Sequence, residues 1–287
     1  YFHLDERDLA FINQRRGKHN RLGIALQLTT ARFLGTFLPD PLQIPSFIRF
    51  YIAAQLNISR PEILSRYAER ENTRWEHQGL IKLYYDYHDF GDFPWTFRLK
   101  RLLYTRAWLS NERPGLLFDF ATAWLLQNKI LLPAASTLTR LIGEVRERAS
   151  RRLWRRLALL PDSWQKTQLD GLLEIPEGQR ISVLEEMRKG PVTISGPSFT
   201  DALERYTRLR SMEFSRLNFS GLPAIQLRNL ARYAGMASVK YISRMPDERR
   251  LAVLTAFVKA QEISALDEAV DVLDMLILDI TRSAKNI

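Results

Sequence analysis

Apolar residues recur at intervals of three and four along nearly the whole chain, whereas strictly alternating polar and apolar runs are scarce. This spacing matches the 3.6-residue period of an α-helix. Pro and Gly punctuate the gaps between these segments, as they do in turns. Short stretches that could be extended, such as residues 192–194, are too isolated to build a sheet. The pattern therefore predicts an all-α protein of several helical domains.

Two helices are predicted at the start of the chain, one over residues 5–14 and one from residue 21 onward. Asp5 and Asn20 precede them and are good N-cap residues, because their side chains can accept from backbone N–H groups of the first turn. The segment between the two helices collects basic and polar side chains: Arg15, Arg16, Lys18, His19, Asn20 and Arg21. An exposed corner of this kind can offer cations and helix N-terminal N–H groups to one anion. A solvated turn is the other interpretation.

Residues 1–90 are expected to form a first helical DNA-binding domain. Helices are predicted over residues 46–56, from Pro61 onward and over about 73–86, and residues 47–70 have the outline of a helix-turn-helix unit. A polar set follows that outline and is a candidate for contacts in a DNA groove: Arg66, Arg70, Thr73, Arg74 and His77. Glutamates at positions 62, 69 and 76 leave open a solvated face braced by ion pairs.

Residues 91–160 are expected to form a second, basic helical DNA-binding domain, which follows a linker at 88–94. Helices are predicted over 95–109, over 116–127 and from Pro133 onward, and the last of them has an apolar stripe with arginines on its opposite face. The candidate DNA contacts here are Arg98, Arg101, Thr137, Arg140, Arg148, Arg151 and Arg155. Glu144 can pair with Arg148, and Glu147 with Arg151, each four residues on. Arg152, Arg155 and Arg156 have no acidic neighbours in the sequence.

Residues 161–287 are expected to be a helical linker or scaffold. A Pro- and Gly-containing loop is predicted over 189–198, and two long helices are predicted over 249–262 and 265–280, joined at Ile263 and Ser264. Asp267, Asp271 and Asp274 repeat at helical spacing in the second of them. They predict an exposed acidic stripe that keeps the helix soluble. A small metal nuclease built on these carboxylates is the alternative hypothesis.

The charge distribution separates these three regions. The net charge of +10 divides into +2 for residues 1–90, +8 for residues 91–160 and 0 for residues 161–287. Of the 42 basic residues, 33 are Arg, which pairs with phosphate and with guanine in a fork geometry. A focused basic region favours a polyanionic partner. A membrane surface is disfavoured, because no basic amphipathic helix with a Trp, Phe and Leu face stands alone.

Several classes of site are missing from the sequence. The chain has no Cys, which excludes a disulfide framework and a thiolate metal site. Its four His lack metal-ligand spacing, and no Gly-rich phosphate loop occurs. No apolar run is long enough to cross a bilayer, and no secretory signal opens the chain. The chain starts at Tyr1 rather than at Met, so we expect a piece of a longer, intracellular protein.

The basic corner lies within a longer motif, D-L-x-x-I-x-x-R-R-x-x-x-N-R-L-G-x-A-x-Q-L. The motif is carried here by Asp8, Leu9, Ile12, Arg15, Arg16, Asn20, Arg21, Leu22, Gly23, Ala25, Gln27 and Leu28. On these residues the chain resembles the N-terminal region of the transposases of class II replicative transposons, the Tn-three family. Looser matches follow at residues 45–56, 67–77, 129–133 and 249–257, so the resemblance covers nearly the whole chain.

The resemblance implies that this segment binds double-stranded DNA at the terminal inverted repeats of a transposon, within replicative transposition. It implies a bacterial cytoplasmic protein associated with the nucleoid, and it leaves open a homodimer formed through the full-length protein. The catalytic part of the family is an RNase H-like domain with acidic ligands for magnesium, downstream of the region matched here. We therefore expect this segment to have no enzyme activity and no cofactor, and magnesium to belong to the catalytic domain alone.

Two further hypotheses stay open. An all-helical protein-interaction scaffold, whose basic region binds an acidic protein, would show no dependence on DNA sequence. RNA binding is the other, although the exposed aromatic residues on a sheet that many RNA-binding modules use for stacking are missing here.

Overall fold

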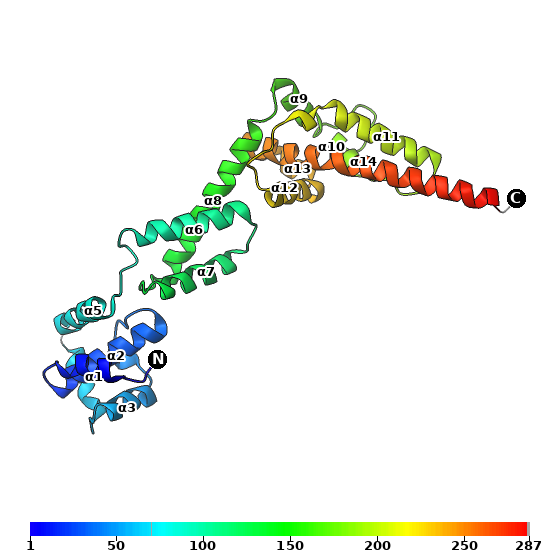
Figure 1. Ribbon diagram of the computed structural model, residues 1–287. Helices are drawn as coiled ribbons and strands as arrows, with labels where there is room; N and C mark the ends of the chain where they lie inside the picture. The colour runs from blue at the N-terminus through cyan, green and yellow to red at the C-terminus, as the bar shows by residue number, and fades with distance from the viewer. Residues whose placement is uncertain (70, 286–287) are drawn as a thin grey trace. The chain divides into compact units, whose positions relative to one another are not determined.

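The computed structural model describes residues 1–69 and 71–285, and the prediction of an all-α protein is confirmed (Figure 1). Over these residues the backbone forms helices, short 3-10 turns and loops, with one isolated parallel bridge between His88 and Ile130 and no strand. None of the helices in the described ranges is long and apolar enough to cross a membrane.

The chain divides into two compact units. Unit 1 comprises Tyr1–Leu103 and Arg113–Gly143, and unit 2 comprises Tyr104–Glu112 and Glu144–Ile287. Two helices, α6 (Trp95–Leu109) and α8 (Ala135–Ala158), pass from one unit into the other. The three domains predicted from the sequence, with boundaries at 90 and 160, stay a prediction.

Unit 1 is organised around one helix. It contains α1 (Glu6–Asn13), α2 (Lys18–Leu34), η1 (Pro41–Gln43), α3 (Ser46–Gln55), η2 (Pro61–Ile63), α4 (Leu64–Ala68), α5 (Glu71–Tyr85), α7 (Pro114–Gln127) and the first parts of α6 and α8. Every residue of α2 from Leu22 to Ala31 is buried, and α1, α3, α4 and α5 all pack against it. Gly23 is needed within α2, because a Cβ there would lie 2.4 Å from the ring of Tyr67.

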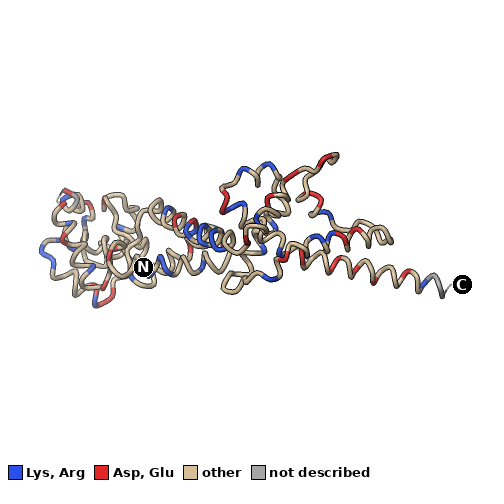
Figure 2. Tube along the Cα trace, turned by 90° about the horizontal axis from the view of Figure 1, so that it is seen from above, with Lys and Arg blue, Asp and Glu red and all other residues tan. Residues whose placement is uncertain are grey.

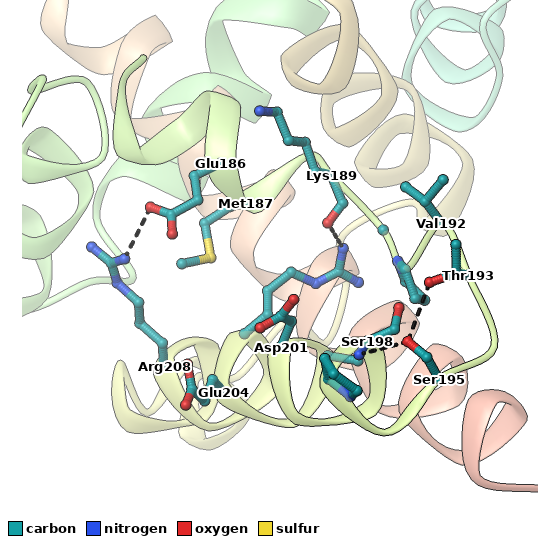
Figure 3. Close-up of a pocket in the computed structure, with 15 residues that line it drawn as sticks. Glu186, Met187, Lys189, Val192, Thr193, Ser195, Ser198, Asp201, Glu204 and Arg208 are labelled. Carbon is teal, nitrogen blue, oxygen red and sulfur yellow. Dashed lines mark hydrogen bonds and ion pairs between the residues drawn. The ribbon is translucent and has the colours of Figure 1, made fainter. Parts of the chain in front are cut away.

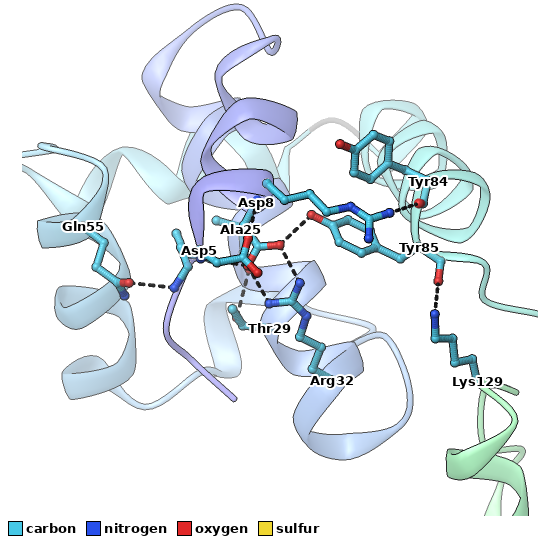
Figure 4. A network of polar contacts seen from close by, with 11 residues as sticks. Asp5, Asp8, Ala25, Thr29, Arg32, Gln55, Tyr84, Tyr85 and Lys129 are labelled. Atoms are coloured by element: carbon cyan, nitrogen blue, oxygen red, sulfur yellow. Dashed lines mark hydrogen bonds and ion pairs between the residues drawn. The ribbon is translucent and has the colours of Figure 1, made fainter.

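A buried polar network fixes α1 against α2 and α5 (Figure 4). Asp8 is fully buried and accepts two hydrogen bonds from the guanidinium of Arg32, at 2.5 and 2.6 Å, and one from the Tyr85 hydroxyl at 2.7 Å. Burial alone would raise the pKa of Asp8, but the bonds from Arg32 and Tyr85 outweigh it and hold the pKa below its usual value. Asp8 belongs to the motif that carries the family resemblance, and its place there is structural.

The predicted linker at 88–94 is held by backbone hydrogen bonds at its first residue. His88 donates its backbone N–H to Lys129 and accepts from Leu131 at 2.9 Å, and Leu132 donates to the carbonyl of Gly35 at 2.8 Å. These bonds hold the segment before α8 within unit 1.

Unit 2 is organised around α14 (Asp247–Lys285). It also contains α9 (Ser163–Gly171), α10 (Val183–Met187), α11 (Gly196–Ser211), η3 (Phe214–Arg216), α12 (Ala224–Met236), α13 (Val239–Ser243) and the second parts of α6 and α8. Residues 252–258 of α14 are all buried, and α11 and α12 make the most extensive contacts with it. The predicted break at Ile263 and Ser264 is wrong, because α14 continues through both residues. Neither is Pro or Gly, and a helix supported by packing tolerates both.

Candidate nucleic-acid interface

The basic corner, residues 15–21, is built on a glycine. Gly17 has φ +87°, a conformation that suits a residue without a side chain, and it is the N-cap of α2, which begins at Lys18. The prediction that Asn20 caps this helix is therefore wrong. No side chain at Gly17 accepts a hydrogen bond from the first turn of α2, so the backbone N–H groups of that turn have no capping partner. Partial positive charge at this helix end adds to the cations around it.

Two of the predicted corner contacts hold the corner itself together. Arg21 donates to the carbonyls of Arg15 at 3.0 Å and Asn13 at 3.4 Å, and the Asn20 amide donates to the carbonyl of Arg16 at 2.9 Å. Arg16 and Lys18 are exposed instead, and neither forms an ion pair with any residue that the structure describes. Arg15 lies over the ring of Phe11 at 5.6 Å, and His19 is half-buried beside Gly17. Arg16 and Lys18 are thus the side chains of the corner best placed to meet an anion.

The helix-turn-helix outline is occupied by α3, η2 and α4, and α5 follows it. Arg66 is exposed on α4. Thr73 is half-buried, and Arg74 lies 3.3 Å from the carboxylate of Glu71, which is not one of the three glutamates that the sequence offered as partners. Arg70 lies outside the described residues.

His77 is part of the core of unit 1. It is 5% exposed, and its Nδ1 lies 3.1 Å from the Tyr67 hydroxyl. Burial and, to a smaller extent, the charge of Arg15 together lower the pKa of His77 to about 4. A buried neutral imidazole cannot reach a DNA groove, so we withdraw His77 from the candidate contacts. Its burial depends on Tyr67 of another helix, which no spacing within α5 could reveal.

The Tyr67–His77 pair also shows that two of the predicted clusters are neighbours. Arg15 of the basic corner acts electrostatically on His77, and Arg74 of α5 acts electrostatically on Tyr67. Both cations therefore lie near one hydrogen-bonded pair. Unit 1 thus places the corner and the start of α5 within electrostatic range of the same buried pair.

The second predicted cluster in unit 1 lies on α6 and at the start of α8. Arg98 is exposed and lies over the ring of Trp95 at 5.2 Å, and Arg101 is exposed on the same helix. Thr137 is half-buried and Arg140 is exposed in the first turns of α8, which begins two residues later than predicted. Pro133 therefore precedes the helix instead of opening it.

In unit 2, α8 presents three of the predicted arginines to solvent. Arg148, Arg151 and Arg155, the α8 arginine face, are exposed, and Arg151 makes the predicted bridge to Glu147 at 2.5 Å. Arg148 and Arg155 form no ion pair among the described residues, so the predicted pairing of Glu144 with Arg148 is wrong. Figure 2 shows Lys and Arg gathered along α8, whereas basic and acidic positions are mixed along the C-terminal helices.

Two further cations of α8 are held by neutral groups. Arg152 donates to the Tyr104 hydroxyl at 3.2 Å and lies over the ring of Trp108 at 5.3 Å. Arg156 donates to the carbonyl of Gly221 at 3.2 Å. Partners of this kind orient a guanidinium without cancelling its charge. The sequence did not single out these two residues as contacts, although the aromatic residues of α6 were a signal for Arg152.

A pocket of about 620 Å³ lies in unit 2 between the loop before α11 and α11 itself (Figure 3). It is lined by equal numbers of charged groups of each sign: Glu186, Lys189, Asp201, Glu204, Arg205 and Arg208. Arg208 points toward Glu186, at 3.4 Å, and the buried Arg205 donates to the carbonyl of Lys189 and to Glu268. Because its two arginines already have partners, the pocket is poorly suited to a phosphate.

The described residues, 1–69 and 71–285, contain no group of acidic and histidine side chains that could hold a metal ion. Within these ranges no three His, Asp or Glu side chains converge, so Asp267, Asp271 and Asp274 do not form the cluster that the nuclease hypothesis requires.

Comparison with known proteins identifies the family. A family model described as a domain of unknown function, DUF4158, matches residues 1–145. The transposase for transposon gamma-delta of Escherichia coli (strain K12) is 78% identical over 285 residues, which are 99% of this chain and 28% of that protein. The transposases for Tn1546 of Enterococcus faecium and Tn501 of Pseudomonas aeruginosa are 29% and 28% identical over 98% and 100% of the chain. The chain spans 28–29% of the length of these relatives.

These matches correct one expectation. We expected the chain not to be an enzyme, but the proteins that align with it over almost all its length are transposases. The expectation is wrong, because it rested on the absence of a recognisable active site in this stretch alone. The motif around the basic corner, the domain match and the relatives agree: the chain belongs to the Tn-three family of transposases.

Proposed function

We propose that this chain binds the terminal inverted repeats of its transposon as duplex DNA, and so positions the transposon end for transposition. The proposal rests on exposed cations that have no carboxylate partner among the described residues, which include Arg16 and Lys18 in the basic corner of unit 1 and Arg148 and Arg155 on α8 in unit 2. Cations that no carboxylate neutralises repel one another unless an anion such as phosphate meets them.

Phosphate contacts supply position and most of the affinity. We assign this role to the basic corner, to the α8 arginine face, and to Arg98 and Arg101 of α6. The first turn of α2 adds its N–H groups, which suit a phosphate oxygen. Affinity for any duplex then falls as salt rises, because each neutralised phosphate releases condensed counterions.

Base contacts supply the sequence preference. We assign these to helix starts, where short polar side chains and Arg can reach base edges: Thr137 and Arg140 of α8, and Thr73 and Arg74 at the start of α5. Arg66 and Arg70 stay predicted contacts of the same region. Arg21 and Asn20 act indirectly, since their hydrogen bonds fix the shape of the corner.

The test compares binding of the chain to a terminal-repeat duplex and to a scrambled duplex of the same composition, by fluorescence anisotropy. We expect tighter binding to the repeat, and Arg140→Ala to reduce that preference by about 5- to 150-fold, the equivalent of one base contact. Arg208→Ala, which removes an arginine already paired with Glu186, is the matched control and should change neither affinity.

Equal affinity of the unaltered chain for both duplexes would reject sequence-specific binding and favour the scaffold hypothesis. Equal loss on both duplexes in Arg140→Ala would make Arg140 a phosphate contact. Tighter binding to an RNA duplex of the same sequence than to the DNA would reject DNA as the partner.

A further inference from the structure

Two phenylalanines at the start of α6 project into solvent. Phe93 is 86% exposed and Phe97 is 55% exposed, and neither stacks on another ring among the described residues. Phe is ordinarily one of the most buried residue types, although a single exposed one needs no explanation. Two of them at one end of a basic helix call for a partner that accepts both rings and cations.

Phe97 lies on the solvent side of α6. Leu99 and Leu103 are fully buried and mark the side of the helix that packs in unit 1. The helical period puts Phe97 on the opposite side. Three exposed cations share the solvent side with it: Arg98, Lys100 and Arg101.

The backbone beneath the two rings is held by packing and hydrogen bonds. Trp95, which lies between them in the sequence, packs its ring against those of His88 and Trp124, with centroid distances of 5.0 and 6.4 Å. The Thr96 hydroxyl donates to the carbonyl of Phe90. A side chain that separates stacked bases works against the stacking free energy, so it requires a rigid support of this kind.

A second set of exposed aromatic residues, on α3, lacks the basic surroundings. Phe47 is 72% exposed, and Phe50 and Tyr51 are about half exposed. Arg49 is the one cation within α3, and it is half-buried. Charge therefore separates the two aromatic surfaces, and only the one on α6 suits a nucleic acid. Phe47 provides a matched control for it.

An apolar ring among cations suits a base step of a duplex. Proteins that bind the minor groove insert Phe, Leu or Met between neighbouring base pairs, and the duplex kinks at that step. Arg98 and Arg101 are assigned to phosphates above, so Phe97 continues that contact surface toward the bases. Flexible pyrimidine–purine steps yield most easily to such an insertion.

We propose that Phe97, together with Phe93, is a wedge that enters a base step of the transposon end and kinks the duplex there. The proposal rests on the DNA binding proposed above and adds an activity to it, because the chain deforms the duplex as well as holding it. Kinks made by such wedges are about 20–90°.

Two fluorescence measurements on the full chain test the wedge, both at protein concentrations that saturate the duplex. Dyes at the two ends of a terminal-repeat duplex report a kink as increased energy transfer. 2-Aminopurine, placed at each step in turn, reports unstacking, because stacked neighbours quench its fluorescence. The unaltered chain should increase energy transfer, and it should raise the 2-aminopurine fluorescence several-fold at one step.

Three variants identify the residues responsible. Phe93→Ala/Phe97→Ala should abolish both signals while the duplex stays bound, because the cations of α6 are intact. Phe97→Leu keeps an apolar wedge and should keep most of the kink. Phe47→Ala, which removes a comparably exposed ring from α3, should change neither signal.

The outcomes separate the wedge from DNA binding itself. A duplex that the unaltered chain binds but leaves straight and stacked overturns the wedge alone, and a protein surface would then be the partner of the two rings. Signals that persist in the double variant, or that Phe47→Ala removes as well, also overturn the wedge. A chain that binds no duplex rejects the proposed function and the wedge with it.

Discussion

His77 and Tyr67 form a buried pair in unit 1 whose charge state depends on pH. The folded pKa of His77, lowered to about 4 by burial, lies below the value of 6.5 expected in the unfolded chain. A depressed pKa favours the neutral form in the folded state. The resulting stability is complete above pH 6.5 and is lost as the pH falls toward 4, because the unfolded chain takes up the proton first.

We predict that the free energy of unfolding falls by about 3 kcal/mol from this residue between pH 6.5 and pH 4. His77→Gln should be less stable at pH 7 but should lose this part of the pH dependence, as measured by urea unfolding at several pH values. Asp8 does not contribute in this window, because its pKa lies below 3.8 and its stabilisation is lost only at lower pH. Parallel pH profiles of the variant and the unaltered chain would contradict the prediction.

Gly23 belongs to the family motif, and the packing around it leaves no space for a larger side chain. A Cβ at this position would lie 2.4 Å from the ring of Tyr67, a side chain that is 1% exposed and cannot move away. We predict that Gly23→Ala destabilises the chain by roughly 1–3 kcal/mol, the usual result of overpacking. Gly79→Ala is the matched control in α5, where no atom lies within 4 Å of the new Cβ, and it should raise the melting temperature instead.

At the scale of the element, α14 offers a test of where a helix can be interrupted. Ser264 lies inside a 39-residue helix, at the junction where the sequence predicted a break. Ser264→Pro removes a backbone hydrogen bond and clashes with the preceding turn, so it should cost about 3 kcal/mol or more. Thermal unfolding followed at 222 nm measures it, with Ser264→Ala as the control. Equal stability of the two variants would show that the helix is already broken there.

The predicted helices agree best with the structure where strong local signals mark both ends. Helix α6 has the predicted bounds, Asp5 caps α1 through a capping box, and Pro114 opens α7. Local signals failed where backbone geometry or distant packing decides. Helix α2 begins three residues before its predicted start, because Gly17 adopts the positive φ that the preceding turn requires.

Only the part of the candidate site that depends on local sequence could be predicted. Exposed Arg on α8 follows from the helical period. Of the two predicted pairs on this helix, the structure confirms Glu147 with Arg151 but not Glu144 with Arg148. The burial of His77 and the anchoring of Arg152 by Trp108 depend on contacts between helices that no periodicity contains.

At the scale of the whole molecule, the question is whether both units contact one duplex. Each unit has its own exposed cations, so variants can be confined to one unit at a time. Arg16→Ala/Lys18→Ala removes two cations from unit 1, and Arg148→Ala/Arg151→Ala/Arg155→Ala removes three from unit 2. If every one of these side chains meets a phosphate, the slope of log affinity against log salt should decrease by about 1.8 and 2.7 respectively, since each phosphate contributes about 0.9.

The combined variant decides between one and two contacting units, because independent phosphate contacts add in the salt slope. If both units bind the duplex together, the five substitutions should lower the slope by about 4.5, measured by anisotropy from low to moderate salt. If only one unit binds, the combined variant should match one of the partial variants, and the other partial variant should behave like the unaltered chain. Arg208→Ala/Arg216→Ala removes two arginines that, like Arg151, are paired with glutamates but lie outside the assigned contacts, and it controls for the general loss of positive charge. A slope that falls equally in this control would show that net charge, and not the placement of the cations, governs binding, and the assignment of the α8 arginine face would then be rejected.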